Sequence, residues 1–194
     1  ITTVLAALVL TSCSSMNSAI TIGDKEFSTS DVQKPVDEVL RDRKKVDTSQ
    51  MQLPEADELL RNQAQFYIVG ILLDRIAADK KLSVTNADIA ARRTEILSQV
   101  GGEAELPKAL VGASLAQSNL DAYLKILIIS EKLSKDIILS GVSSEQAAEE
   151  VNKIVVALAK KLGVKVNPKY GKWNPDTASI ESGDLTDGAV IPAP

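Results

Sequence analysis

The chain of 194 residues has no histidine and a single cysteine, Cys13. Without histidine, the chain cannot build a Ser-His-Asp triad, a Cys-His pair or a histidine-ligated zinc site. One cysteine also excludes a four-cysteine zinc site and a disulfide within the chain. Because these two counts exclude much chemistry, we expect no catalytic centre, no metal and no cofactor.

Aromatic residues are scarce as well, and the chain is acidic. Its 22 basic and 26 acidic residues give a net charge of −4, whereas a nucleic-acid-binding protein normally shows a basic face. The six aromatic residues are too few for a surface on which bases stack: Phe27, Phe66, Tyr67, Tyr123, Tyr170 and Trp173. We therefore expect no nucleic-acid partner. The apolar share of 44% is typical of a globular chain, and the length fits one domain with a tail.

The first twelve residues, ITTVLAALVLTS, carry no charge. Their apolar run is too short to cross a hydrocarbon core of about 30 Å as a helix. It has the length of the hydrophobic region of a signal peptide. We expect residues 1–12 to be a signal peptide that is incomplete at its start and is removed from the mature protein.

The apolar run ends in the quartet Leu10-Thr11-Ser12-Cys13. This quartet resembles the bacterial lipobox, in which small residues admit the signal peptidase and the cysteine thiol takes up a diacylglycerol. The alternative is a plain secretory signal followed by an incidental cysteine. On the lipobox interpretation, Cys13 is lipidated and residues 13–18 form a polar tether. The protein would then be anchored to the extracytoplasmic face of the bacterial cell membrane.

Between residues 28 and 162, apolar residues recur at helical spacing and are interrupted by turn and capping signals. Ser28 and Asp31 have capping-box spacing, as do Thr85 and Asp88. Pro35 means that the first helix must start late or kink. The spacing predicts six helices, of which the second is the most buried: about 28–45, 54–81, 85–100, 103–111, 118–137 and 144–162.

Two kinds of charged cluster admit more than one interpretation. The end of the first predicted helix is basic: Arg41, Arg43, Lys44 and Lys45. This cluster could bind anionic lipid, but it is also typical of a solvated helix end whose cations suit the helix dipole. Adjacent acids occur at Asp37-Glu38 and at Glu149-Glu150. They could in principle do acid–base work, but neighbours on a helix diverge by about 100°. Enzymatic activity is therefore the least favoured hypothesis for the function of this chain.

Two short segments at opposite ends of the folded region alternate as strands do: residues 19–22 and residues 164–166. Because an isolated short strand is not stable in water, we expect the two segments to pair. The predicted fold is mainly α, with about six helices closed by a short two-stranded sheet formed from the two ends of the ordered chain. We expect the domain to span residues 19–173 and residues 174–194 to form a flexible C-terminal tail.

Three stretches occur in an order that resembles a known family. They are the segment from Ile20 to Asp31, the stretch from Gly101-Gly102 through Glu131-Lys132-Leu133, and the closing segment VNPKYGKW at residues 166–173. Together they resemble the N-terminal helical domain of SurA-type and PrsA-type envelope chaperones. The chain is most similar to small actinobacterial lipoproteins that carry this domain alone. The closing motif, to which we assign a structural role, is the most specific: Val166, Asn167, Pro168, Tyr170, Gly171 and Trp173.

The resemblance implies a function as well as a fold. Full-length relatives usually add a parvulin prolyl isomerase domain, which we do not expect in a chain without histidine. The resemblance thus implies a membrane-anchored, chaperone-like module that binds unfolded or exported polypeptides and has no isomerase activity. Four residues are candidates for client binding, although each could instead fill the core: Phe66, Tyr67, Tyr123 and Leu124. The alternative function is a structural or adaptor lipoprotein that binds one specific envelope partner.

Overall fold

The computed structural model describes residues 17–183, so the predicted signal peptide and Cys13 lie outside the described residues. The helices are α1 (Thr29–Arg43), α2 (Ala56–Asp79), α3 (Asn86–Val100), α4 (Leu106–Gly112), α5 (Leu120–Leu139) and α6 (Ser144–Leu162). The strands are β1 (Ser18–Ile22), β2 (Lys25–Ser28), β3 (Val164–Val166), β4 (Lys172–Asn174) and β5 (Ser179–Glu181). Single 3₁₀ turns precede α5 and follow β3, at Gln117–Asn119 and Pro168–Tyr170. The predicted fold class, mainly α with a short sheet, is confirmed.

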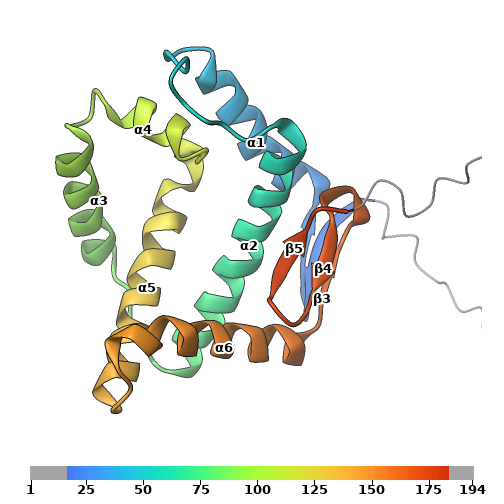
Figure 1. Cartoon of the computed structure of the whole chain (residues 1–194), viewed down its shortest axis with the longest axis vertical. Coiled ribbons are helices and arrows are strands. Elements are labelled where there is room, and N and C mark those ends of the chain that lie inside the picture. Colours follow the sequence, from blue (N-terminus) through green and yellow to red (C-terminus); the bar gives the residue numbers. More distant parts are fainter. Residues whose placement is uncertain (1–16, 184–194) are drawn as a thin grey trace, which may run out of the picture.

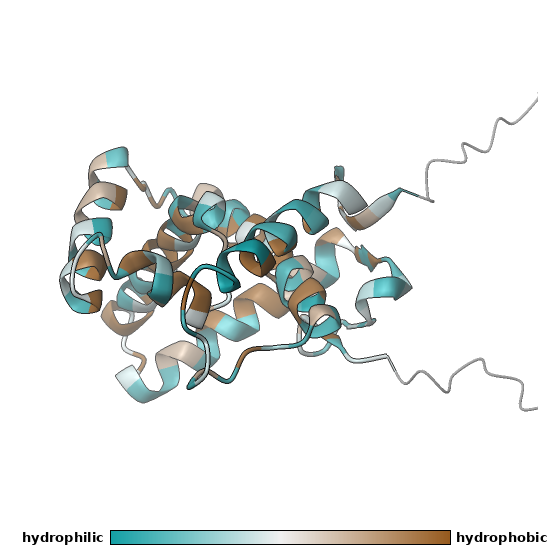
Figure 2. Cartoon of the chain, turned by 90° about the horizontal axis from the view of Figure 1, so that it is seen from above, coloured by the Kyte–Doolittle hydropathy of each residue, from teal (hydrophilic) through white to brown (hydrophobic). Residues whose placement is uncertain are grey.

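Helix α2 is the centre of the fold and packs against α1, α5 and α6. In Figure 1, α6 crosses the lower ends of α2 and α5, the strands lie together on one side, and α3 lies on the opposite side. Seen from above, hydrophobic segments gather toward the middle of the molecule (Figure 2). No helix among residues 17–183 is long and apolar enough to span a membrane.

The first sheet joins the two ends of the domain, as predicted. Ile20 of β1 lies opposite Val166 of β3, and Ile22 lies opposite Val164. Ile20 and Ile22 are almost fully buried in the core formed with α1 and α2, which explains why this register is fixed. The sheet contains a third strand that we did not expect, because β2 pairs with the other edge of β1.

The second sheet is a hairpin of β4 and β5, and it corrects the predicted domain boundary. We expected a flexible tail from residue 174, but folded structure continues to Glu181. The side-chain amide of Gln65 on α2 explains this, because it donates to the Ala178 carbonyl and accepts from the Ile180 N–H, both at 2.9 Å. It thus pairs with β5 as a neighbouring strand would, and Ile180 is buried against α2.

Local capping signals place the helix starts. Both predicted capping boxes form, with Ser28 and Asp31 at the start of α1 and with Thr85 and Asp88 at the start of α3. Hydrogen bonds from the capping residues lower the pKa of both aspartates. Ser118 lies three residues before Asp121 but does not cap α5, because its backbone N–H and its hydroxyl donate to the Glu38 carboxylate of α1.

Pro35 does not delay the start of α1, which begins at Thr29 and continues to Arg43. A proline has no N–H to offer to the carbonyl four residues earlier, which here belongs to Asp31. The hydroxyl of Tyr67 on α2 donates to that same carbonyl at 3.1 Å. A side chain of the central helix therefore supplies a hydrogen bond that the proline cannot make.

A candidate groove between helices α2 and α5

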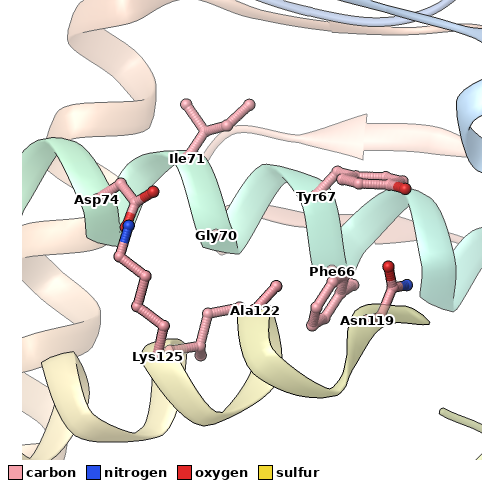
Figure 3. Close-up of a pocket in the computed structure, with 9 residues that line it drawn as sticks. Phe66, Tyr67, Gly70, Ile71, Asp74, Asn119, Ala122 and Lys125 are labelled. Atoms are coloured by element: carbon pink, nitrogen blue, oxygen red, sulfur yellow. The ribbon is translucent and has the colours of Figure 1, made fainter. Parts of the chain in front are cut away.

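A groove of about 180 Å³ opens between α2 and α5. Its α2 wall carries Phe66, Tyr67 and Ile71, and its α5 wall carries Ala122 and Ile126 (Figure 3). Gly70 leaves room between the walls, because a Cβ there would already meet the Ile126 side chain at 3.5 Å. Between its two ends, the groove is lined by apolar residues.

The aromatic wall is held in place by packing and by one hydrogen bond. The rings of Phe27 and Tyr67 stack with centroids 5.0 Å apart, and Phe66 meets Tyr67 edge-on at 6.0 Å. Burial, and secondarily the charge of Asp31, raises the pKa of the Tyr67 hydroxyl. This hydroxyl stays protonated at neutral pH and holds the ring through its bond to the Asp31 carbonyl.

The two ends of the groove are polar. At one end the ammonium of Lys125 lies 2.7 Å from the carboxylate of Asp74, and both side chains are about half exposed. Such an exposed ion pair adds little stability. At the other end, the buried Asn119 donates from its amide to Gln63 at 3.2 Å. The Nε2 donor of Gln63 is buried without a partner among the described residues.

A second hollow of about 300 Å³ lies on the far side of Ile71 and reaches the β1–β2 hairpin. It shares Ile71 and Asp74 with the groove, and Ile22, Phe27 and Leu162 contribute its apolar lining. Charged side chains also line this second hollow, from Asp24, Lys25 and Arg75.

The four predicted client-binding residues have different positions. Phe66 and Tyr67 line the groove. Tyr123 is 37% exposed on the outer surface of α5 and does not line the groove. Leu124 has no exposed surface and packs with Leu106, Leu110 and Leu120, so it belongs to the core and presents nothing to a client.

Sequence reasoning missed the α5 side of the groove and its polar ends. Ala122, Lys125 and Ile126 carry no signal of their own, because helical spacing shows which residues share a face but not which helix covers that face. Asn119 precedes α5 and gave no signal either. Gly70 was the one available hint, as it interrupts an otherwise apolar stretch of α2.

The residues of the predicted closing motif hold the end of the domain together. Val166 pairs with β1, and the Asn167 backbone N–H donates to the Ala19 carbonyl at 2.8 Å. Tyr170 is buried in the core that β1 forms with α1 and α2, and Trp173 packs against this core with part of its surface exposed. Pro168 lines a shallow hollow beside β1. Gly171 has φ +125°, and a Cβ there would lie 2.2 Å from the Glu181 carbonyl oxygen.

Two of the four cations at the end of α1 have side-chain partners within the protein. Arg43 donates to the Pro54 carbonyl and to Ser114, and Lys45 pairs with Asp42. The adjacent acids have partners too: Asp37 accepts from Gln33, Glu38 from Ser118, and both Glu149 and Glu150 pair with Lys153.

The groove offers contacts for binding. Within residues 17–183, no three His, Cys, Asp or Glu side chains come together to hold a metal ion. The aromatic wall can contact an apolar segment. The ion pair at one end and Asn119 at the other can contact polar groups beside that segment. Comparison of the chain with family models, with curated proteins and with solved structures found no match to any of them.

Proposed function

We propose that this protein is a membrane-anchored extracytoplasmic lipoprotein that binds unfolded or exported polypeptide segments, without isomerase or other enzymatic activity. The observation that carries the proposal is the apolar groove between α2 and α5, which has an aromatic wall and polar ends. The groove suits a short apolar stretch of an extended chain. The resemblance of the sequence to SurA-type and PrsA-type chaperones supports the same function by analogy.

The test is aggregation suppression with a groove-blocking variant. Ala122 is exposed and lines the groove, so Ala122→Trp fills the groove with an indole and leaves the core intact. Ala148→Trp is the matched control, because Ala148 is exposed on α6 and lies outside the groove. We expect the wild type and Ala148→Trp to delay aggregation of an unfolded client and Ala122→Trp to lose that effect. Equal activity of the two variants would refute the groove as the binding site.

The alternative is an adaptor lipoprotein that binds one folded envelope partner. The exposed side chains of Tyr123, Ile138 and Leu139 on α5 favour this alternative, since they lie outside the groove and could pack on a folded surface. A pull-down from the native membranes separates the two functions. Many unrelated clients support polypeptide binding, whereas one stoichiometric partner supports the adaptor.

The anchor is tested separately. We expect Cys13→Ala either to release the protein from the membrane fraction or to leave an uncleaved precursor. Mass spectrometry of the wild-type protein should show a diacylglycerol on Cys13. A wild-type Cys13 without lipid, together with unchanged fractionation of the variant, would contradict the anchor.

A further inference from the structure

The segment that closes the domain lies beside the point where the described chain begins. The Asn17 carbonyl accepts a hydrogen bond from the Thr29 N–H at 2.8 Å, so Asn17 is fixed against the start of α1. The side chain of Asn167 donates to the Ser18 carbonyl at 3.0 Å. Asn167 therefore lies at the end of β1 next to Asn17, and β3 runs from there along β1 to Val164, opposite Ile22, on the side of the molecule where Figure 1 shows the strands.

Three exposed lysines belong to this segment, and we call them the lysine face: Lys165, Lys169 and Lys172. Lys165 lies opposite Thr21 on the solvent side of the first sheet. Lys169 comes two residues after Asn167, whose side chain accepts from the Lys169 N–H. Lys172 begins β4.

Five lysines of residues 17–183 form ion pairs, and the three lysines of the lysine face are among those that do not. Elsewhere in residues 17–183, ion pairs within 4 Å engage Lys45, Lys125, Lys132, Lys153 and Lys160. No such pair engages any of the three lysines of the lysine face in that part of the chain. The nearby acids are Glu26 on β2 and Glu181 on β5, and Glu181 is already bonded to the Asn174 amide. The ammonium groups thus remain available to an external anion.

The number of residues between Cys13 and Asn17 limits how far the domain can lie from a membrane that holds Cys13. Four residues span at most about 14 Å when fully extended. If Cys13 carries a lipid, the membrane surface lies within that reach of Asn17, at the end of β1 beside which Asn167 and Lys169 lie. We propose that the lysine face docks on the anionic headgroups of the membrane to which Cys13 is anchored. This inference rests on the lipid anchor of the proposed function, and it adds a fixed orientation of the domain on the bilayer.

The electrostatics suit a tethered domain better than a free one. Each lysine close to an anionic surface shifts the equilibrium about fivefold toward contact, and each nearby carboxylate opposes this. Because the whole chain carries a net charge of −4, free protein should bind such a surface weakly. A short tether makes the contact intramolecular, so a weak preference is sufficient to orient the domain. Salt should weaken the contact, because the lysines are exposed.

The chain offers two unique probes for the test. Cys13 is the only cysteine, so the chain from Cys13 onward can be coupled to maleimide lipids in vesicles without native lipidation. Trp173 is the only tryptophan and follows Lys172 directly, so energy transfer from Trp173 to dansyl headgroups reports how close the lysine face lies. We expect higher transfer on phosphatidylglycerol-rich vesicles than on phosphatidylcholine vesicles. We also expect the difference to vanish at high salt.

Charge reversal gives the decisive comparison. The triple variant Lys165→Glu, Lys169→Glu and Lys172→Glu should lose the extra transfer. The control carries three reversals at exposed lysines just after α2, on α4 and on α5, outside residues 164–172, and should keep the extra transfer: Lys80→Glu, Lys108→Glu and Lys135→Glu. If the reversed lysine face does not fold by circular dichroism, alanine at the same three positions replaces it. Equal transfer by the lysine-face variant and the control would overturn the inference. Because the coupling is chemical, this outcome is independent of the groove and of native lipidation.

Discussion

The hydrogen bond between the Tyr67 hydroxyl of α2 and the Asp31 carbonyl of α1 should contribute measurably to the stability of the domain. Pro35 removes the N–H that this carbonyl would otherwise receive, and the Tyr67 hydroxyl replaces it at 3.1 Å. We expect Tyr67→Phe to lower the free energy of unfolding by about 0.5–1.5 kcal/mol, the net value of one neutral hydrogen bond. Since the ring and its stacking on Phe27 remain, the loss isolates the hydroxyl.

The second half of this prediction is a double-mutant cycle with Pro35→Ala. Alanine restores an N–H that can bond to the Asp31 carbonyl within α1, so the Tyr67 hydroxyl becomes dispensable. We therefore expect Tyr67→Phe to cost little in the Pro35→Ala background. The difference between the two backgrounds should be about 1 kcal/mol, which is within the range of coupling energies measured between residues in contact.

Urea unfolding followed by Trp173 fluorescence measures all four proteins of the cycle. A change of about 1 kcal/mol should also move the melting temperature by about 2–4 °C for a domain of this size. If Tyr67→Phe costs the same with proline and with alanine at position 35, the hydroxyl does not substitute for the missing N–H and this reasoning is wrong.

Three further predictions concern stability. Tyr170→Phe should leave the free energy of unfolding unchanged or raise it by about 1 kcal/mol, because the Tyr170 hydroxyl is buried with no partner among the described residues; urea titration checks this. Gly171→Ala should lower it by more than about 1 kcal/mol, because the added Cβ meets the Glu181 carbonyl and φ is +125°; a melting temperature equal to that of the wild type would contradict this. The capping carboxylates of Asp31 and Asp88 have lowered pKa values in the folded protein. Their contribution to the free energy of unfolding is therefore complete above the unfolded pKa of about 3.9 and is lost as the pH falls below it. Substitution of both residues by asparagine should flatten the acid side of the profile of stability against pH.

The fold could be predicted where its determinants are local. The capping boxes at Ser28 and Thr85 and the glycine stop at Gly101 each lie within a few residues of the helix end that they define. The pairing of β1 with β3 was a longer-range prediction. It succeeded because short strands of this length require partners, and the two segments recognised as strands could supply one another's.

The hairpin of β4 and β5 could not be predicted in the same way. Its sequence is polar and reads as a loop, and its stability depends on Gln65, more than 100 residues earlier, and on the close approach at Gly171. The groove shows the same limit. Of the predicted client-binding residues, Phe66 and Tyr67 line the groove, whereas Leu124 turns inward into the core because of how α3, α4 and α5 pack together.

The central claim, that the groove between α2 and α5 binds polypeptide, is tested most directly by site-specific photo-crosslinking. A benzophenone amino acid is placed at Ala122, which lines the groove, or at Ala148, which is exposed outside it. Each protein is then irradiated with an unfolded client. We expect strong crosslinks to the client from position 122 and few from position 148, as polypeptide binding in the groove requires. Equal crosslinking from both positions, or none from position 122 while aggregation is still suppressed, would contradict it.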